Sequence, residues 1–151
     1  MPMGLLFDFI KEKQNMELEE SFIGELDLDL GNEILDEQKL GDTNLKYKLG
    51  TCGIYVYNNE GQIPHFHIKT KDKKWECCIE IYRPLYFNHG TKQGRLNNKQ
   101  CELLDEWLKK KTFPFNITNW ENISLSWDNS QNPSTNVPIN RIKPNYLLLN
   151  K

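Results

Sequence analysis

Two stretches in the first third of the chain alternate between apolar and charged residues, the pattern of half-buried β-strands. They cover residues 22–30 and 44–49, and in each the apolar side chains point to one side. The outward charged residues are Glu25, Asp27 and Asp29 in the first stretch and Lys46 and Lys48 in the second. If the strands pair, these charges neutralise one another at about 0.2–1 kcal/mol per pair. If they do not, the row of carboxylates stays accessible to a partner.

The middle of the chain predicts a meander of strands joined by tight turns. Residues 54–57 are rich in β-branched and aromatic side chains and precede the turn cluster 58–61. A second strand begins after Pro64, where the missing N–H does least harm. The charged turn 71–74 then leads into a third strand over 75–82.

One register sorts the side chains of these strands into an apolar and a polar face. With 71–74 as the turn, the pairs are Phe66 with Ile79 and Ile68 with Cys77 on the apolar face, and His65 with Glu80, His67 with Cys78 and Lys69 with Glu76 on the polar face. Aligning the preceding strand with Val56 opposite Phe66 extends both faces. This alignment places Tyr55 and Tyr57 beside the two histidines.

Two helices are predicted after the strands. The first covers about 97–111, with Asn97 as its cap and Gln100 in the capping-box position. Its apolar stripe consists of Cys101, Leu103, Leu104, Trp107 and Leu108. A shorter second helix starts at Thr118, with Glu121 closing its capping box.

The expected fold class is α+β: an antiparallel sheet of about four to five strands packed against the helix at about 97–111, with a short second helix and an extended tail. A chain of 151 residues buries roughly 68–70% of its unfolded surface, so we expect residues 1–151 to form a single domain. Its parts are an acidic N-terminal segment, an α+β core and an Asn/Pro-rich tail, over residues 1–42, 43–127 and 128–151. A weaker helix is expected near 5–14, and residues 146–149 are expected to dock back onto the core.

The net charge of −2 hides a strong asymmetry along the chain. Residues 1–42 carry 12 acidic and 3 basic side chains, whereas residues 43–113 carry 13 basic and 7 acidic ones. One interpretation is a solvated acidic face. The other is a surface that docks onto a basic partner, with Glu25, Asp27 and Asp29 as the contact residues.

Composition and local sequence patterns bear on the cellular compartment in which the protein is expected. No stretch approaches the roughly 18 apolar residues of a membrane span. The N-terminal residues lack the basic start, apolar run and cleavage site of a secretory signal. The four cysteines form no CxxC pair and are expected to be reduced thiols. We therefore expect a cytoplasmic protein with no membrane partner.

The polar face gathers the residue types that bind zinc. His65 and His67 are two apart on one strand, so both rings project from the same face. Together with Cys78 and Glu80 opposite them, they are the candidate ligands of a zinc cofactor. His89 adds a third nitrogen if its loop folds back, and a site with one open position would activate water for hydrolysis. In the alternative interpretation no cofactor is bound, and Glu80 hydrogen-bonds His65 on a wet face.

Other chemistries have weaker support. The chain has no glycine-rich phosphate loop, no GxSxG elbow and no cysteine in a recognisable nucleophilic setting, so no catalytic residue is assigned. Direct nucleic-acid binding would use the lysines of the middle region, but a pI near 5.9 favours solvated charge. These lysines are Lys69, Lys71, Lys73, Lys74, Lys109, Lys110 and Lys111.

A resemblance to a known family is carried by three segments. These are Ile63-Pro64-His65-Phe66-His67-Ile68, Cys78-Ile79-Glu80-Ile81 and Leu103-Leu104-Asp105-Glu106-Trp107. Together, over about residues 52–111, they resemble a family of short bacterial proteins of unknown function marked by a Pro-His-x-His strand, a second strand and a helix ending in Glu-Trp. Members of that family tend to be small cytosolic proteins linked to toxin–antitoxin pairs and mobile elements. The resemblance implies a partner-regulating protein rather than a metabolic enzyme.

The leading hypothesis is a non-enzymatic intracellular protein that binds and restrains a macromolecular partner. An antitoxin-like role and inhibition of a defence nuclease both fit, with a basic nucleic-acid-binding protein or a nuclease as the expected protein partner. The first alternative is a small metal-dependent hydrolase that uses His65 and His67. The second is an accessory protein that binds nucleic acid directly.

Overall fold

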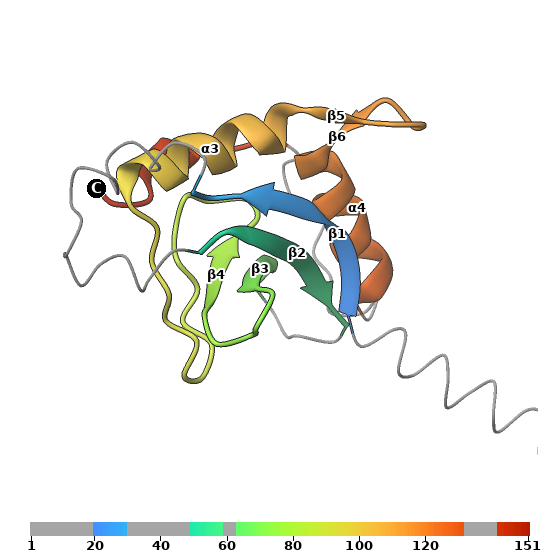
Figure 1. The fold of residues 1–151 in the computed structure, drawn as a ribbon. Helices are drawn as coiled ribbons and strands as arrows, with labels where there is room; N and C mark the ends of the chain where they lie inside the picture. Colours follow the sequence, from blue (N-terminus) through green and yellow to red (C-terminus); the bar gives the residue numbers. More distant parts are fainter. Residues whose placement is uncertain (1–19, 30–48, 59–62, 132–141) are drawn as a thin grey trace, which may run out of the picture.

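The computed structural model describes residues 20–29, 49–58, 63–131 and 142–151. Its strands are β1 (Glu20–Asp27), β2 (Thr51–Tyr57), β3 (His65–Thr70), β4 (Glu76–Glu80), β5 (Lys111–Thr112) and β6 (Ile117–Thr118). Its helices are α3 (Asn98–Lys109), α4 (Asn119–Ser130) and the short 3₁₀-helix η2 (Tyr146–Leu148). Together they form an α+β fold (Figure 1).

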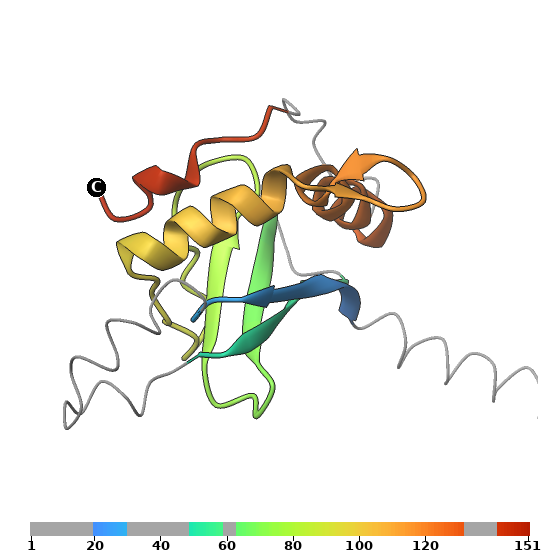
Figure 2. The ribbon, with the colours of Figure 1, turned by 45° about the horizontal axis from the view of Figure 1, so that its top comes forward.

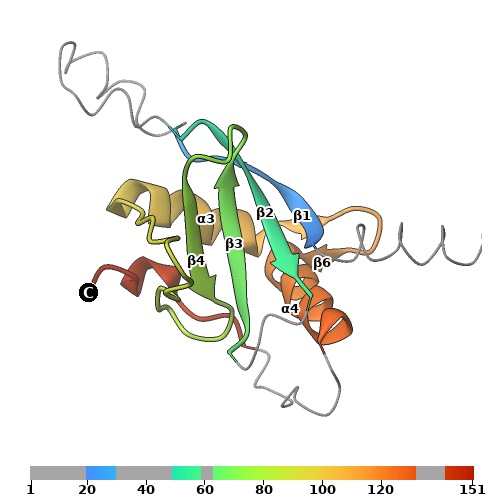
Figure 3. The same cartoon turned by 90° about the horizontal axis from the view of Figure 1, so that it is seen from below.

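The four long strands form one antiparallel sheet in the order β1-β2-β3-β4 (Figure 3). Both predicted registers are confirmed, because His65 pairs with Glu80 across β3 and β4 and Tyr55 pairs with His67 across β2 and β3. The predicted turn at 71–74 joins β3 to β4. The predicted partition of side chains between two sheet faces is therefore present.

The apolar face of the sheet packs against α3, which lies across the strands (Figure 2). The strand residues of this core include Cys52, Ile54, Val56, Phe66, Ile68, Cys77 and Ile79, all fully buried. Helix α3 contributes the predicted stripe, with Cys101, Leu104 and Leu108 buried. This packing leaves the opposite face of the sheet, which carries the histidines, to be covered by other segments.

Both helix starts follow the predicted capping boxes. The Asn97 side chain accepts from the Gln100 N–H, and the Thr118 side chain accepts from the Glu121 N–H. Helix α4 is longer than the sequence predicts: it continues past the expected apolar face to Ser130 and has 12 residues, as many as α3.

The structure corrects the prediction for the acidic strand near the N-terminus in two ways. The strand ends at Asp27, and among the described residues it pairs with β2, whereas the stretch predicted as its partner lies almost wholly outside them. Glu25 and Asp27 face solvent as predicted, but Asp29 is only 8% exposed, because its carboxylate accepts hydrogen bonds from the backbone N–H groups of Leu49 and Gly50. The row of carboxylates is thus one residue shorter than predicted. Leu30, Lys46, Lys48 and the weaker helix near 5–14 lie outside the described residues.

Two features lie at the margins of the fold. The C-terminal segment docks back as predicted, since Tyr146 and Leu149 are buried in the core. The short strands β5 and β6 form a hairpin that the sequence pattern does not predict, and it projects beyond the sheet (Figure 1). In the described part of the chain no helix has both the length and the apolarity needed to cross a membrane.

A candidate metal centre

Strand β3 places His65 and His67 on the face of the sheet opposite α3, as the period-two alternation predicts. Both histidines are 0% exposed. The face is therefore covered, and the alternative interpretation, which places His65 on a wet face, is wrong in this respect. The covering side chains come from three segments far apart in sequence.

The largest part of the cover is the segment between β4 and α3, which folds back along the outer edge of β4. Its backbone is fixed there by hydrogen bonds from the Glu80 N–H to the Leu85 carbonyl and from the Phe87 N–H to the Cys78 carbonyl, both 2.9 Å. Gly90 then turns the chain with a φ of +61°, a conformation that favours glycine. This path brings His89 over the β3 histidines.

Aromatic rings enclose the two buried imidazoles. Phe87 stacks on His65 with ring centroids 4.1 Å apart, and Tyr57 stacks on His67 at 4.2 Å. Trp127 of α4 reaches His65 from a third direction, at 5.3 Å. The imidazoles thus lie in a largely apolar enclosure, where their polar atoms depend on specific partners.

Two groups of potential ligand atoms meet in this enclosure. The first is His65, His67 and His89, and the second is His67, Glu76 and Cys78. Within each group the ligand atoms lie within 4.8 Å of one another. Because both groups include His67, we treat them as alternative sites for one ion.

Hydrogen bonds define the orientation of the two buried rings. The Nδ1 atom of His65 lies 2.8 Å from the carbonyl oxygen of Ile63, and Nδ1 of His67 lies 2.5 Å from the carboxylate of Glu76. A carbonyl or carboxylate on Nδ1 fixes the N–H tautomer there and assigns coordination to the other nitrogen, Nε2. This is the usual arrangement around histidines that bind metals.

Charged groups around His67 favour an ionised carboxylate beside it. Burial by itself would raise the pKa of Glu76, but the hydrogen bond with His67 and the positive charge of the nearby Lys92 lower that pKa. The Lys92 ammonium lies 3.3 Å from the same carboxylate. Burial raises the pKa of the Tyr57 hydroxyl to about 12, against the effect of Lys69, whose ammonium donates to that hydroxyl at 2.5 Å. Tyr57 is therefore a neutral phenol near pH 7.

The four predicted ligands are not all brought together. Cys78 contacts His67, with its Sγ 3.2 Å from Nδ1, and belongs to the second group. Glu80 belongs to neither group: it lies opposite His65 in the ladder, but its carboxylate accepts from Arg83 Nε at 2.8 Å. Its assignment as a ligand is not supported by this geometry. The hydrogen-bond partner that the alternative interpretation gives to His65 is likewise the Ile63 carbonyl rather than Glu80.

Glu76 is the residue that sequence reasoning missed. It lies opposite Lys69 in the ladder, as predicted. The Lys69 ammonium reaches Glu20, 2.8 Å away, and the Glu76 carboxylate contacts His67. The alternation of Glu76, Cys78 and Glu80 on one strand face could have placed Glu76 within reach of His67. The alternation by itself does not indicate which of these three side chains contacts a histidine.

Comparisons with known proteins give no independent assignment: no family model, curated protein or solved structure matches this chain. The resemblance to the family with the Pro-His-x-His strand therefore stays a prediction. Inference about function depends on the geometry of the chain's own side chains.

Proposed function

We propose that this protein binds one divalent transition-metal ion, with zinc as the best fit, through His65, His67 and His89. Three imidazoles form a set that zinc accepts readily, and they leave a fourth position for water or another ligand. The observation that carries the proposal is the convergence of the three rings, with the Nδ1 atoms of the two β3 histidines already held by an oxygen acceptor.

The burial of the site supports a structural role rather than hydrolysis. Two of the three proposed ligands are 0% exposed and His89 is half-buried, so a substrate has little access to the ion. An ion at this position would tie the segment after β4 to the centre of the sheet. We infer a metal-stabilised binding protein, and the hydrolase of the sequence analysis is the less supported alternative.

Thermal unfolding with and without zinc tests the proposal. Zinc at 100 times its Kd stabilises a one-site protein by about 2.7 kcal/mol. For a chain of this size that corresponds to a rise in Tm of roughly 5–11 °C. His89→Gln, in the half-buried turn, should remove most of the rise while preserving the fold without metal. Differential scanning fluorimetry and metal analysis of the purified protein are the measurements.

The controls separate the two ligand groups. Gln93→Ala, an exposed change in the same segment, should leave the zinc-dependent rise intact. Cys78→Ser should leave it nearly intact as well, and a cobalt-substituted sample should lack the absorption of a thiolate ligand. If the Tm of the wild-type protein is the same with and without zinc, the proposal is contradicted. Loss of binding in Cys78→Ser but not in His89→Gln would move the ion to the second group.

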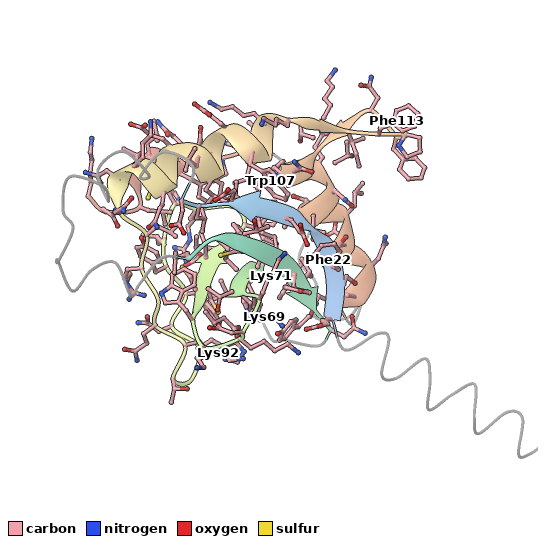
Figure 4. The ribbon with its side chains drawn as sticks, viewed as in Figure 1. Phe22, Lys69, Lys71, Lys92, Trp107 and Phe113 are labelled. Carbon is pink, nitrogen blue, oxygen red and sulfur yellow. The ribbon has the colours of Figure 1, made fainter. Side chains whose placement is uncertain are left out.

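A second candidate function, restraint of a protein partner, is favoured by the β5–β6 hairpin. Phe113 lies at its tip and is 97% exposed (Figure 4). Phe115, between the same two strands, is 78% exposed. Exposed aromatic residues on a projecting element are typical anchors for a pocket on a partner. The acidic pair Glu25 and Asp27 is the remaining part of the predicted docking surface.

Affinity capture from the native host tests this candidate. The wild-type protein should retain a stoichiometric partner, and the double variant Phe113→Ser with Phe115→Ser should lose it, because hot-spot aromatics each contribute about 2 kcal/mol or more. Phe22→Ser, a 57% exposed phenylalanine on β1, is the matched control and should retain the partner. Equal recovery with the hairpin variant would contradict a role for the hairpin.

A further inference from the structure

A basic groove lies next to the histidine centre, between the β3–β4 turn and the segment that precedes α3. Its volume is about 570 Å³. It is lined by Lys73, Lys74, Trp75, Glu76, Thr91, Lys92, Gln93, Gly94 and Arg95. Nothing in the proposed metal site uses the outer part of this groove.

The charge of the groove is strongly one-sided. Four of its lining residues are cations, namely Lys73, Lys74, Lys92 and Arg95. Among the described residues that line the groove, Glu76 is the one carboxylate, and it is already engaged by His67 and Lys92. The groove therefore presents an excess of positive charge, although the whole chain has a net charge of −2. Such a local field attracts a polyanion.

Two of the lining side chains are held in place. Arg95 donates to the Asn88 side chain at 3.1 Å, and its guanidinium lies over the Tyr86 ring at 4.3 Å. The Trp75 indole lies so close to Gly94 that a Cβ added there would come within 2.6 Å of the ring. The groove thus has a fixed aromatic wall beside a fixed cation, a pairing that suits a base beside a phosphate.

The turn that forms the other wall carries backbone strain. Lys73 has a φ of +61°, a left-handed conformation that glycine or asparagine adopts at lower cost. The folded protein is therefore less stable with lysine at this position than it would be with glycine. Such positions concentrate where a side chain has a function.

We propose that this groove binds single-stranded nucleic acid, with phosphates against the lysines and a base stacked on Trp75. The groove is open along its length, since Lys73, Lys74, Thr91, Gln93 and Arg95 are all exposed. A free nucleotide usually occupies a cleft that buries most of its surface, whereas a strand runs along an open basic groove with aromatic platforms. A duplex is wider, and its bases are stacked inside the double helix, so they cannot stack on Trp75.

Fluorescence anisotropy of a labelled 12-nucleotide oligo(dT) on the full chain tests the proposal. Lys74→Gln should weaken binding by roughly twofold to fivefold. It should also reduce the slope of log K against log salt by about 0.7, the value for one lost contact to a single strand. Lys73→Gly should weaken binding to a similar extent and raise Tm, because it removes a charge and relieves the strained backbone. A strand of the same length without bases should bind more weakly than oligo(dT).

The matched control is Lys71→Gln, a lysine of the same turn that is not among the residues lining the groove. It should leave the affinity unchanged. The proposal is overturned if oligo(dT) fails to bind at low salt, if Lys71→Gln weakens binding as much as Lys74→Gln, or if duplex DNA, a mononucleotide or inorganic phosphate binds as tightly. Each titration is run with zinc-loaded and with EDTA-treated protein. A failure to bind zinc and a failure to bind the strand are then separate results.

Discussion

At the scale of single residues, buried polar side chains in this protein are matched by specific partners. Asp105 of α3 is 4% exposed, yet its carboxylate accepts from the Tyr146 N–H at 3.1 Å and forms ion pairs with Lys143 and Lys109. Burial by itself would raise the pKa of Asp105, but these hydrogen bonds lower it below 3.8. The folded state therefore favours the ionised form.

Asp105→Asn tests the contribution of this carboxylate. A carboxylate whose pKa is lower in the folded than in the unfolded state contributes fully above the unfolded value and loses its contribution as the pH falls through the folded value. The variant should lose about 1.5–3 kcal/mol of unfolding free energy at pH 7. It should also show a shallower loss of stability below pH 3.8 than the wild type. Urea unfolding between pH 2 and 7 measures both effects.

Glu106→Gln is the control for this experiment, because Glu106 is the exposed neighbour on the same helix. It should keep the acid dependence of the wild type. If Asp105→Asn and the wild type lose stability in parallel below pH 3.8, the ion pairs of Asp105 do not contribute as inferred.

The outcome for the histidines shows how far residue patterns reach. The alternation at 65–67 was sufficient to place both rings on one sheet face, because side chains in a strand alternate regardless of context. The contribution of Glu76 and the exclusion of Glu80 were not predictable from that pattern. They depend on which nearby group, His67 or Arg83, offers each carboxylate a partner.

At the scale of elements, the end of β4 is the point where the helices and the C-terminal segment join. The Ile81 carbonyl accepts from Trp120 Nε1 of α4 at 2.9 Å and from the Tyr146 hydroxyl of η2 at 2.5 Å. The same hydroxyl lies 3.0 Å from the Glu80 carbonyl. Two elements distant in sequence are therefore fixed to one strand end.

Tyr146→Phe isolates the hydroxyl of this junction. Removal of the hydroxyl should lower the free energy of unfolding by about 1 kcal/mol. This is near the lower end of the cost of leaving a buried polar group without a partner, because the Ile81 carbonyl keeps its hydrogen bond from Trp120. Tyr146→Ala should cost about 3–5 kcal/mol, because it also leaves a cavity in the core. Chemical denaturation measures both changes. A loss in Tyr146→Phe equal to that in Tyr146→Ala would contradict the division between hydrogen bonding and packing.

Element boundaries were predictable where local chemistry sets them. Both helix starts were found from their capping boxes, which need only residues three apart to meet. The β5–β6 hairpin has two-residue strands and an aromatic tip, so it carries too little alternation to be recognised. The end of β1 was missed because Asp29 continues the alternation but uses its carboxylate to bind backbone groups.

At the scale of the whole molecule, the sheet separates two environments. One face and α3 form the apolar core, and the other face collects the histidine centre and leads to the basic groove. The segment between β4 and α3 is shared by both sites, because it supplies His89 to the first and Lys92 and Arg95 to the second. An ion at the centre would therefore also hold one wall of the groove.

The sequence by itself determined the α+β class, the registers of the central strands and the starts of the helices. These follow from alternation, turns and capping, which act between residues near in the chain. Only the tertiary structure decided that the histidines are buried, that His89 joins them and that lysines of the turn face Arg95 across a groove. The path of the segment after β4 decides the last two and, together with Tyr57 and Trp127, the first. That path is set by packing against the edge of a strand rather than by a periodic pattern within the segment.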